Sequence, residues 1–517
     1  MANKTKFQAI KGTRDLLPPE TELWNRVEQT AREVFGTYGY GEIRLPVFEP
    51  TELFARAVGG ETDIVSKEMY GFLDRHEKLE LPRVIGEYGE FIDKVEKLFE
   101  SGEIPRNPNN KLLLRRLRTH WKEYVEHPTT EPFVLEDFEN LFRMTIAANS
   151  LELGPSLSLR PEATASVCRA YIEHNMQQLP APVKLYYTGP MFRRERPQKG
   201  RYRQFYQVGA EVLGGSDAPG IDAEVIEMVM VLFARLGLEG VQLEINSIGH
   251  SLPVQAGPPP IGGNPECRRA YVEALRAALE KVKDKLGADS QRRIETNPLR
   301  VLDSKLEHEQ PIIEKLPRIG DYLCADCTKH YAEVKRKLEM RGVAFKENWR
   351  LVRGLDYYMR TTFEITARGL GSQNAVCGGG RYDGLIELLG GPPTKGIGFA
   401  IGEDRLILSL QDAGKGSVAE GRDVYIAWMG EKAQPTAIAA ARTLREAGFR
   451  VELPPVEQRF GKALGQADKL GSRYALILGE DEVSSGQWTL KTLADGSQAK
   501  YTEAELVAFL RRQKVEK

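Results

Sequence analysis

The sequence predicts a chain of mixed α+β class that contains several domains. Its 517 residues correspond to three or four domains at roughly 150 residues per domain. Hydrophobic residues make up 41% and charged residues 28%, which is typical of a folded globular protein. Strand-like segments lie among helical patterns along most of the chain, and the two alternate regularly near its C-terminal end.

Charge and hydropathy narrow the function classes. The 72 basic and 73 acidic residues give a net charge of -1, so any nucleic-acid surface is expected to be local. Mean hydropathy is -0.40 and no apolar run reaches roughly 18 residues. We therefore expect no membrane-spanning helix and no membrane partner. Five cysteines and an N-terminus without a secretory signal favour a cytoplasmic protein.

The first element is a helix over residues 20–38, followed by a strand. Gly39 ends the helix, and residues 42–48 form a strand-like segment that contains Pro46. Proline lacks an N–H group, so this strand belongs at a sheet edge or at an interface. The segment is therefore either a dimer contact or an ordinary edge strand. The helix is predicted from apolar residues at helical spacing, namely Leu23, Val27, Ala31, Val34 and Tyr38.

Residues 76–156 are expected to form a separate unit. They are rich in charge and in turn signals, such as those in residues 104–110. Residues 111–118 hold four cations and no acid, with three leucines on one helical face: Leu113, Leu114 and Leu117. This pattern fits either a nucleic-acid patch or the solvated face of a small helical bundle.

The middle of the chain mixes strands and helices. Residues 183–187 and 205–213 are predicted strands joined by a polar loop. The further expectations are a helix at 222–236, a Pro/Gly-rich loop at 254–265, mainly helices over 266–343, and strand-like, Gly-rich segments at 351–366 and 374–402.

A small α/β domain is predicted at the C-terminal end. A linker over residues 412–422 precedes it. Strands and helices then alternate: 424–428, 433–447, 449–453, 461–470, 474–478 and a final helix at 502–513.

Several common motifs are incomplete or missing. Residues 396–402 have the wrong glycine spacing for a dinucleotide loop, and the sequence contains no Walker A, HExxH or GxSxG motif. Cys324 and Cys327 form a lone CxxC with His330 nearby. A structural zinc site needs four ligands, so helical packing is expected here and no metal site.

The strongest chemical signal is the basic loop of residues 193–203, which holds six cations and one acid. Arginine forks bind oxyanions bidentately, so this loop is suited to phosphates. Phe205 follows and can stack on a base, and Gln207 and Glu211 lie on one face of the return strand. Taken alone, the loop also fits a basic surface hairpin.

Three further segments carry polar groups beside glycines or helix starts. Residues 378–384 let backbone approach a ligand closely, and residues 353–358 place a cation beside two phenols. Arg405 opens a helix after Gly402 and can stack on an aromatic ring. Glu162 precedes another helix, where its carboxylate either serves a ligand or compensates the helix dipole.

These segments, in this order, resemble bacterial-type histidyl-tRNA synthetase, a class II aminoacyl-tRNA synthetase. Residues 351–358 (LVRGLDYY) and 377–385 (CGGGRYDGL) are similar to the two histidine-specific signatures of that family. The Pro46 segment, residues 193–211 and residues 396–405 resemble class II motifs 1, 2 and 3. The likeness covers about four-fifths of the chain and implies a homodimer.

The resemblance implies a domain plan around an antiparallel class II sheet flanked by helices. About 80 residues intervene where the family usually has a short turn, and their role is unknown. The implied parts are a catalytic core in three pieces (1–75, 157–220 and 346–412), the unusual insertion (76–156), a helical insertion domain (221–345) and an anticodon-binding α/β domain (420–517).

The resemblance also implies an ATP site, with Mg²⁺ accompanying the nucleotide. Arg193 is expected on the α-phosphate, and Phe205 and Arg405 on either side of the adenine. Arg405 also reaches the γ-phosphate. Glu195 and Arg201 are expected to hold the nucleotide end of the hairpin.

L-histidine is the implied amino-acid substrate. Its α-amino group is expected at Glu162 and Thr164 with Gln207 nearby, and its imidazole at Glu211 and Tyr358. Arg353 is expected to neutralise charge at the reacting carboxylate and phosphate. The full implied histidine set also contains Ala163, Arg193 and Tyr357.

The implied product is histidyl-tRNA, formed on tRNA(His) after histidyl-adenylate. Arg196 and Gln198 are expected to approach the 5′ end of the tRNA. The alternative is a non-catalytic, synthetase-like regulatory subunit of ATP phosphoribosyltransferase. Such paralogues usually lack the anticodon domain, whereas this chain retains residues 420–517.

Overall fold

The computed structural model describes residues 7–60, 62–73, 87–101, 104, 108–126, 156–250, 267–368, 374–416 and 421–515. The chain divides into two compact units. The first comprises Met1–Leu17 and Leu23–Gly416, and the second Pro18–Glu22 and Ser417–Lys517. No helix among the described residues is long and apolar enough to cross a bilayer.

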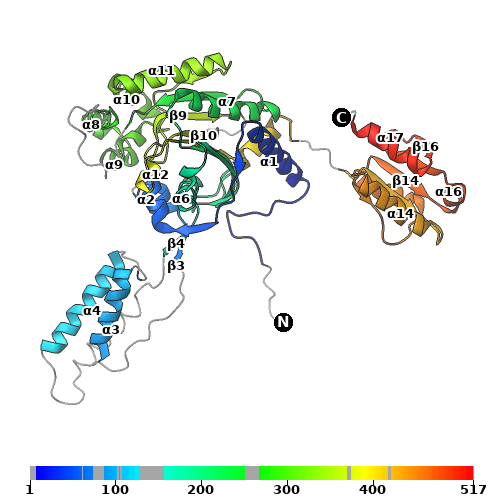
Figure 1. Cartoon of the computed structure of the whole chain (residues 1–517), viewed down its shortest axis with the longest axis horizontal. Coiled ribbons are helices and arrows are strands. Elements are labelled where there is room, and N and C mark those ends of the chain that lie inside the picture. Colours follow the sequence, from blue (N-terminus) through cyan, green and yellow to red (C-terminus); the bar gives the residue numbers. More distant parts are fainter. Residues whose placement is uncertain are drawn as a thin grey trace. The chain divides into compact units, whose positions relative to one another are not determined.

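An eight-stranded sheet organises the first unit (Figure 1). Its order is β1-β5-β6-β11-β10-β9-β7-β8, and the six inner strands are antiparallel, as expected. The edge strands β1 (Gly41–Glu42) and β8 (Lys346–Glu347) pair in parallel. The inner strands are β5 (Val183–Phe192), β6 (Gln204–Leu213), β7 (Gln242–Ser247), β9 (Met359–Thr366), β10 (Ala375–Arg381) and β11 (Gly396–Gly402).

The β5–β6 hairpin confirms the two strands predicted around the basic loop. Its register runs from Val183 opposite Leu213 to Phe192 opposite Gln204. The loop of residues 193–203 therefore lies at the end of a long, twisted ribbon next to the centre of the sheet. β11 confirms that residues 396–402 are a strand rather than a dinucleotide loop.

Helices cover both faces of this sheet. On one face, Phe35 of α1 (Glu20–Thr37) packs against Tyr186 and Phe399 at ring distances of 5.6 and 5.9 Å. The expected apolar stripe of α1 is buried. The other face carries the catalytic candidates and three helices, which share one core: α2 (Thr51–Val58), α6 (Thr164–Glu173) and α12 (Leu385–Leu388).

A buried ion pair fixes α7 (Pro219–Arg235) to the α1 face of the sheet. Asp222 accepts hydrogen bonds from Arg381 (2.5 Å) and from Thr361 (2.6 Å). Both Asp222 and Arg381 are almost fully buried. Removing one partner would leave an uncompensated buried charge, which typically costs about 3–5 kcal/mol.

The prediction of one strand over residues 42–48, broken by Pro46, is wrong in its extent. β1 ends at Glu42, and the next strand, β2 (Phe48–Pro50), belongs to a different sheet. Between them, the Arg160 guanidinium donates to the carbonyls of Leu45 and Pro46 at 2.9 and 3.2 Å. The Arg160 side chain thus takes the place of a neighbouring strand as hydrogen-bond donor to these carbonyls. Pro46 has no N–H group and interrupts the ladder of backbone hydrogen bonds at this point.

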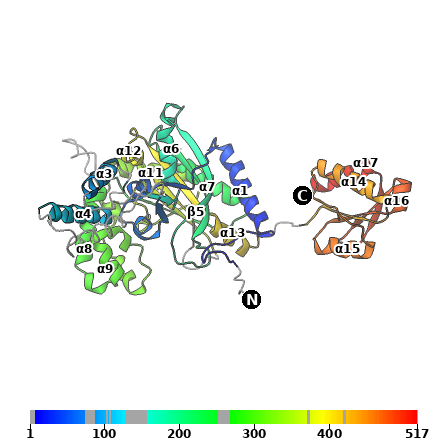
Figure 2. The same cartoon turned by 90° about the horizontal axis from the view of Figure 1, so that it is seen from below.

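β2 pairs with β4 (Ser156–Leu159), which also pairs with β3 (Gly71–Leu73). The segment between β3 and β4 contains α3 (Tyr88–Ser101) and α4 (Pro108–Glu126) (Figure 2).

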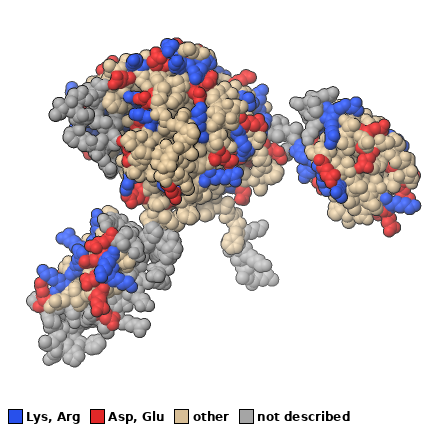
Figure 3. All heavy atoms as spheres, in the orientation of Figure 1, with Lys and Arg blue, Asp and Glu red and all other residues tan. Residues whose placement is uncertain are grey.

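The two helices pack together through a small apolar core. Leu113, Leu114 and Leu117 are buried in it, as predicted, whereas Arg115 and Arg116 are exposed. Arg118 pairs with Glu96 of α3. Figure 3 shows basic and acidic side chains interspersed on the drawn face of this helix pair. The exposed cations fit the predicted solvated face of a helical bundle, and a nucleic-acid patch stays a prediction.

The region between β7 and β9 is mainly helical, as predicted. Helices and turns from residues 267–322 share a core that also contains Val352 and Tyr358 from the segment before β9. The predicted loop at 254–265 lies outside the described residues. The helices are α8 (Cys267–Glu280), α9 (Ala288–Thr296), α10 (Gln310–Ile313) and α11 (Ala325–Met340), with short turns η4 (Lys283–Lys285), η5 (Pro298–Val301), η6 (Glu307–Glu309) and η7 (Ile319–Tyr322).

Three further helices belong to the described part of the first unit. They are η1 (Ile64–Glu68), η3 (Met176–Gln178) and α13 (Glu403–Asp412), and α13 follows β11 directly.

The second unit is the expected α/β domain. Its sheet has the order β13-β12-β14-β15-β16, parallel over the first three strands. The strands are β12 (Val424–Trp428), β13 (Val451–Glu452), β14 (Tyr474–Leu478), β15 (Trp488–Thr492) and β16 (Gln498–Tyr501); the helices are α14 (Ala433–Glu446), α15 (Phe460–Lys469), α16 (Glu480–Ser485) and α17 (Glu503–Val515).

Candidate functional site

A cavity of about 460 Å³ lies on the face of the eight-stranded sheet opposite α1. Strands β6, β9, β10 and β11, the 193–203 hairpin and the segment before β9 contribute to it. Most of the predicted site residues line this one cavity: Glu162, Thr164, Arg193, Glu195, Arg201, Phe205, Gln207, Arg353, Tyr357, Tyr358 and Arg405.

The hairpin supplies two of the cations. Arg193 donates through Nε to the carbonyl of Pro161 at 2.9 Å, and its guanidinium carbon lies 5.2 Å from the centre of the Phe205 ring. Arg201 pairs with Glu195 at 3.0 Å, and Arg193 lies 3.8 Å from the same carboxylate. Glu195 thus orients two guanidinium groups toward the cavity.

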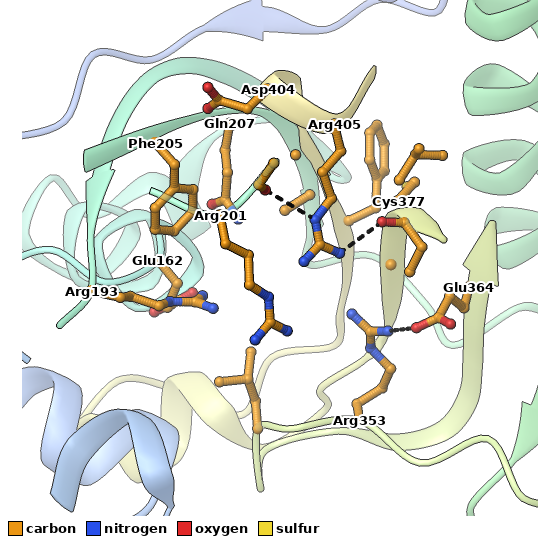
Figure 4. Close-up of a pocket in the computed structure, with 18 of the residues that line it drawn as sticks. Glu162, Arg193, Arg201, Phe205, Gln207, Arg353, Glu364, Cys377, Asp404 and Arg405 are labelled. Carbon is orange, nitrogen blue, oxygen red and sulfur yellow. Dashed lines mark hydrogen bonds and ion pairs between the residues drawn. The ribbon is translucent and has the colours of Figure 1, made fainter. Parts of the chain in front are cut away.

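Arg405, in the first turn of α13, supplies a third cation. It donates to the carbonyl of Ala375 at 2.9 Å and to that of Gly200 at 3.4 Å. Burial lowers the pKa of Arg405, and the nearby Arg201 lowers it further. Figure 4 shows the guanidinium groups of Arg201 and Arg405 side by side, both directed into the cavity. Such crowding of cations favours a bound anion.

Arg353 approaches the same space from the opposite wall (Figure 4). Its Nη1 donates to Glu364 of β9 at 2.6 Å. Burial lowers the pKa of Arg353 and Glu364 raises it, with a net upward shift. A Cβ atom on Gly378 would lie 2.0 Å from Nη2 of Arg353, so this glycine makes room for the guanidinium rather than for a ligand.

Glu162 both caps α6 and lines the cavity. Its carboxylate accepts the backbone N–H groups of Thr164 and Ala165 at 2.7 and 2.9 Å, which stabilises the helix start. Tyr357 donates to it at 3.4 Å. Burial raises the pKa of Glu162, although the hydrogen bonds from Ala165 and Thr164 oppose the shift. The two roles foreseen for this residue are therefore compatible.

Glu211 is fully buried and lies behind the cavity wall rather than among the lining residues. It accepts hydrogen bonds from Tyr382 at 2.5 Å and from Thr164 at 2.7 Å. Burial raises the pKa of Glu211 to about 8, while both hydrogen bonds act in the opposite direction. Gly398 opposes Glu211 on β11, and a Cβ there would overlap the carboxylate.

Gln207 and the two tyrosines complete the polar wall beside Thr164. The Oε1 atom of Gln207 is buried without a hydrogen-bond partner among the described residues, so it can accept from a ligand. The rings of Tyr357 and Tyr358 lie 4.7 Å apart. Burial raises the pKa of Tyr358 to about 12, although Arg353 lowers it, so its hydroxyl remains a donor at neutral pH.

Besides Glu211, three predicted residues do not line the cavity. Ala163 is buried at the start of α6. Arg196 and Gln198 are exposed on the hairpin, where the backbone of Gln198 pairs with that of Arg201 at 2.9 and 3.1 Å. Their position on the open end of the loop leaves them accessible to a large partner.

The structure adds lining residues that sequence analysis missed, including Glu364, Asp303, Lys305 and Asn374. Asp303 and Lys305 follow η5 closely, and no motif used above includes them. Glu364 belongs to a strand with no glycine or motif to mark it, and its role emerges only from its contact with Arg353.

Comparisons with known proteins agree with this geometry. The family model described as "Histidyl-tRNA synthetase" matches residues 129–406, and "Anticodon binding domain" matches residues 423–513. The histidine–tRNA ligase of Koribacter versatilis is 46% identical and that of Solibacter usitatus 45%, over 98% of this chain and 96% and 99% of theirs. The apo histidyl-tRNA synthetase structure from S. aureus has a TM-score of 0.66 at 30% identity, covering 98% of this chain and 100% of that one.

Proposed function

Because the chain belongs to the histidyl-tRNA synthetase family, its activity is that of a histidine–tRNA ligase, and we propose that the cavity described above performs the activation step. The observation that carries this proposal is the convergence of Arg193, Arg201, Arg353 and Arg405 on one cavity. Beside them lies a separate polar wall suited to a small amino acid.

ATP is the substrate that the arginines fit. We propose that Arg193 binds the α-phosphate and that Arg405 binds the γ-phosphate. The adenine ring is proposed to lie between the ring of Phe205 and the guanidinium of Arg405. In the structure without nucleotide, Arg193 lies over the Phe205 ring, where adenine would be placed. Binding of ATP would then move this guanidinium from the aromatic face to phosphate, with Glu195 and Arg201 supporting the hairpin.

Histidine is proposed to bind between Glu162 and Tyr358. The carboxylate of Glu162 and the free Oε1 of Gln207 suit the α-ammonium group, with Thr164 beside them and Tyr357 donating to Glu162. Tyr358 and Glu211 are proposed to recognise the imidazole. An amino acid without a matching imidazole would leave the buried Tyr358 hydroxyl without its ligand partner, which can reduce kcat/KM on the order of 10⁴-fold.

Catalysis needs no general base, because the substrate carboxylate is already ionised. The carboxylate oxygen attacks the α-phosphorus, an O–P bond forms, and the bond to pyrophosphate breaks. Arg193 and Arg353 are proposed to offset the negative charge that gathers at this centre, so catalysis is mostly positioning and electrostatic stabilisation.

A divalent metal accompanies ATP in this proposal, and we take it to be Mg²⁺. The cavity offers the hard oxygen ligands that such an ion prefers, on Glu364 and Asp303. When bound, the ion would neutralise part of the triphosphate charge.

The remaining surfaces are proposed to serve tRNA(His). Arg196 and Gln198 are exposed on the same hairpin loop that carries Arg193. The second unit, matched as an anticodon-binding domain, is proposed to bind the anticodon. We propose a cytoplasmic location for this reaction.

A homodimer is proposed through the segment that contains Pro46. Val47, Phe48 and Phe72 are exposed there, and the rings of Phe48 and Phe72 lie 6.0 Å apart. An exposed aromatic cluster at a short sheet is suited to a second copy. Light scattering on the full chain should give twice the mass of one chain.

The regulatory-subunit alternative is not favoured. The relatives that match nearly the whole chain are named histidine–tRNA ligase, and the cavity retains all of its arginines. ATP–pyrophosphate exchange measured with each of the twenty amino acids separates the two functions. A ligase should give exchange with L-histidine alone; a regulatory subunit should give none with any amino acid.

A further inference from the structure

Four potential metal ligands meet on the first unit, outside the catalytic cavity. His250 follows β7, Cys267 begins α8, Cys324 caps the start of α11, and Cys327 lies in its first turn. Their ligand atoms all lie within 4.8 Å of one another. None of the four lines the cavity.

The spacing of these atoms suits one tetrahedral ion. His250 Nδ1 lies 3.2, 3.3 and 3.8 Å from the sulfurs of Cys267, Cys327 and Cys324, and the sulfurs of Cys267 and Cys327 are 3.8 Å apart. A tetrahedral zinc centre with ordinary bond lengths places sulfurs about 3.8 Å apart and nitrogen about 3.5 Å from sulfur. All three cysteines are free thiols.

The surroundings suit sulfur ligands and a soft metal. The backbone N–H groups of His250 and Cys327 point to the sulfurs of Cys267 and Cys324 at 3.3 and 3.5 Å, a contact that stabilises sulfur ligands. Cys267 and Cys327 are almost fully buried. A donor set of three sulfurs and one nitrogen, with no oxygen, selects zinc over magnesium or calcium.

Sequence analysis missed this arrangement because the second pair of ligands is far from the CxxC. His330, the histidine nearest to it in the sequence, instead contacts the carbonyl of Asp217 at 3.1 Å. His250 and Cys267 are brought to Cys324 only by the packing of β7, α8 and α11.

We propose that His250, Cys267, Cys324 and Cys327 bind one structural Zn²⁺ ion that joins the helical region to the sheet. Four protein ligands close the coordination shell, which is typical of a structural rather than a catalytic zinc.

The same ion would position the histidine-binding segment, a consequence that rests on the proposed function. Arg268, next to Cys267, donates to the carbonyl of Tyr358 at 2.6 Å. The backbone of Arg360 is hydrogen-bonded to the two residues that precede His250. Its N–H donates to the carbonyl of Gly249 at 2.7 Å, and its carbonyl accepts from the N–H of Ile248 at 2.8 Å. The metal ligands are thus one residue away from contacts that hold the backbone at Tyr358 and Arg360.

The test is the metal content of the full-length protein, which does not depend on activity. Elemental analysis should find about one zinc per chain. Cys267→Ser, Cys324→Ser, Cys327→Ser and His250→Ala should each lose most of it. Cys168→Ala is the matched control, because Cys168 is a buried free thiol outside the group, and this variant should retain zinc.

A second measurement uses the parent protein, so that the test does not depend on variants that fold poorly. The parent protein, stripped of metal and given Co²⁺, should show the visible absorption of a tetrahedral cobalt–thiolate site, and zinc should abolish it. In variants that remain folded, KM for histidine should rise more than KM for ATP.

Three results would overturn the proposal: a parent chain that neither contains zinc nor takes up Zn²⁺ or Co²⁺, ligand variants with the zinc content of the parent, or a disulfide between Cys267 and Cys327 in the purified protein. Loss of histidine-dependent exchange alone would count against the proposed function and not against the metal site.

Discussion

At the scale of single residues, the site is a set of arginines held by neighbouring acids and carbonyls. Glu195 orients Arg201, Glu364 orients Arg353, and the carbonyl of Ala375 holds Arg405. In the proposed reaction, cations fixed before substrate binds need no reorganisation as charge develops.

Arg353→Ala should reduce the rate of histidyl-adenylate formation on the order of 10²–10³-fold, because the missing guanidinium stabilises the reacting centre. Histidine affinity should change far less. Pyrophosphate exchange and equilibrium dialysis with histidine provide the two values. The control is Arg442→Ala, an exposed position on α14 that should behave like the parent. Equal exchange rates in Arg353→Ala and the parent would remove Arg353 from the reaction.

Glu211 should make folding stability depend on pH. Its folded-state pKa of about 8 lies above the ordinary value of 4.5, so the native state retains a proton that the unfolded chain releases. The contribution of Glu211 to the free energy of unfolding therefore falls by up to a few kcal/mol as pH rises from about 5 to about 8. Above that range the contribution is constant. Glu211→Gln should flatten this part of the curve, as measured by urea unfolding at several pH values. Parallel curves for the two proteins would show that Glu211 does not titrate in this window.

Most of the residues that the sequence singled out line the cavity, because they lie close together in short motifs. Sequence patterns could not predict that Glu211 lies behind the wall, since its burial depends on Gly398 of β11 and on Tyr382, which follows β10. The partner of Arg353 was missed for the same reason. Contacts between distant segments decide these features, and a single sequence does not display them.

At the scale of elements, periodicity predicted α1, the β5–β6 hairpin and the first strands of the second unit. It failed at residues 42–48, where Arg160 binds the carbonyls around Pro46. It also missed β15 and β16, although Asp495-Gly496 between them is a typical hairpin turn signal. Short strands with polar residues on one face carry little hydrophobic pattern of their own.

The segment between β3 and β4 should be dispensable for activation. Leu73 pairs directly with Ser156, so the ends of the segment are adjacent. Replacing residues 74–155 by Asn-Gly, a two-residue hairpin turn, should preserve the three-stranded sheet. Histidine-dependent exchange should stay within about threefold of the parent, because none of the described residues of α3 or α4 lines the cavity. Loss of exchange in a variant with unchanged circular dichroism would show that the segment shapes the site.

At the scale of the whole molecule, the chain divides into two compact units. A chain that ends at Gly416 retains every residue of the catalytic cavity and lacks the anticodon-binding match. It should retain pyrophosphate exchange and lose most aminoacylation of tRNA(His), measured with labelled histidine. Full aminoacylation by the shortened chain would contradict the assignment of the second unit to tRNA.

The most direct measurement is calorimetric binding of a non-reactive histidyl-adenylate analogue with a sulfamoyl group in place of the phosphate. The full-length protein should bind one analogue per cavity. Arg405→Ala and Tyr358→Phe should each weaken binding by about tenfold or more, through the adenine and the imidazole respectively, and Arg442→Ala should not. Parent-like affinity in both cavity variants would mean that histidyl-adenylate forms elsewhere in the protein.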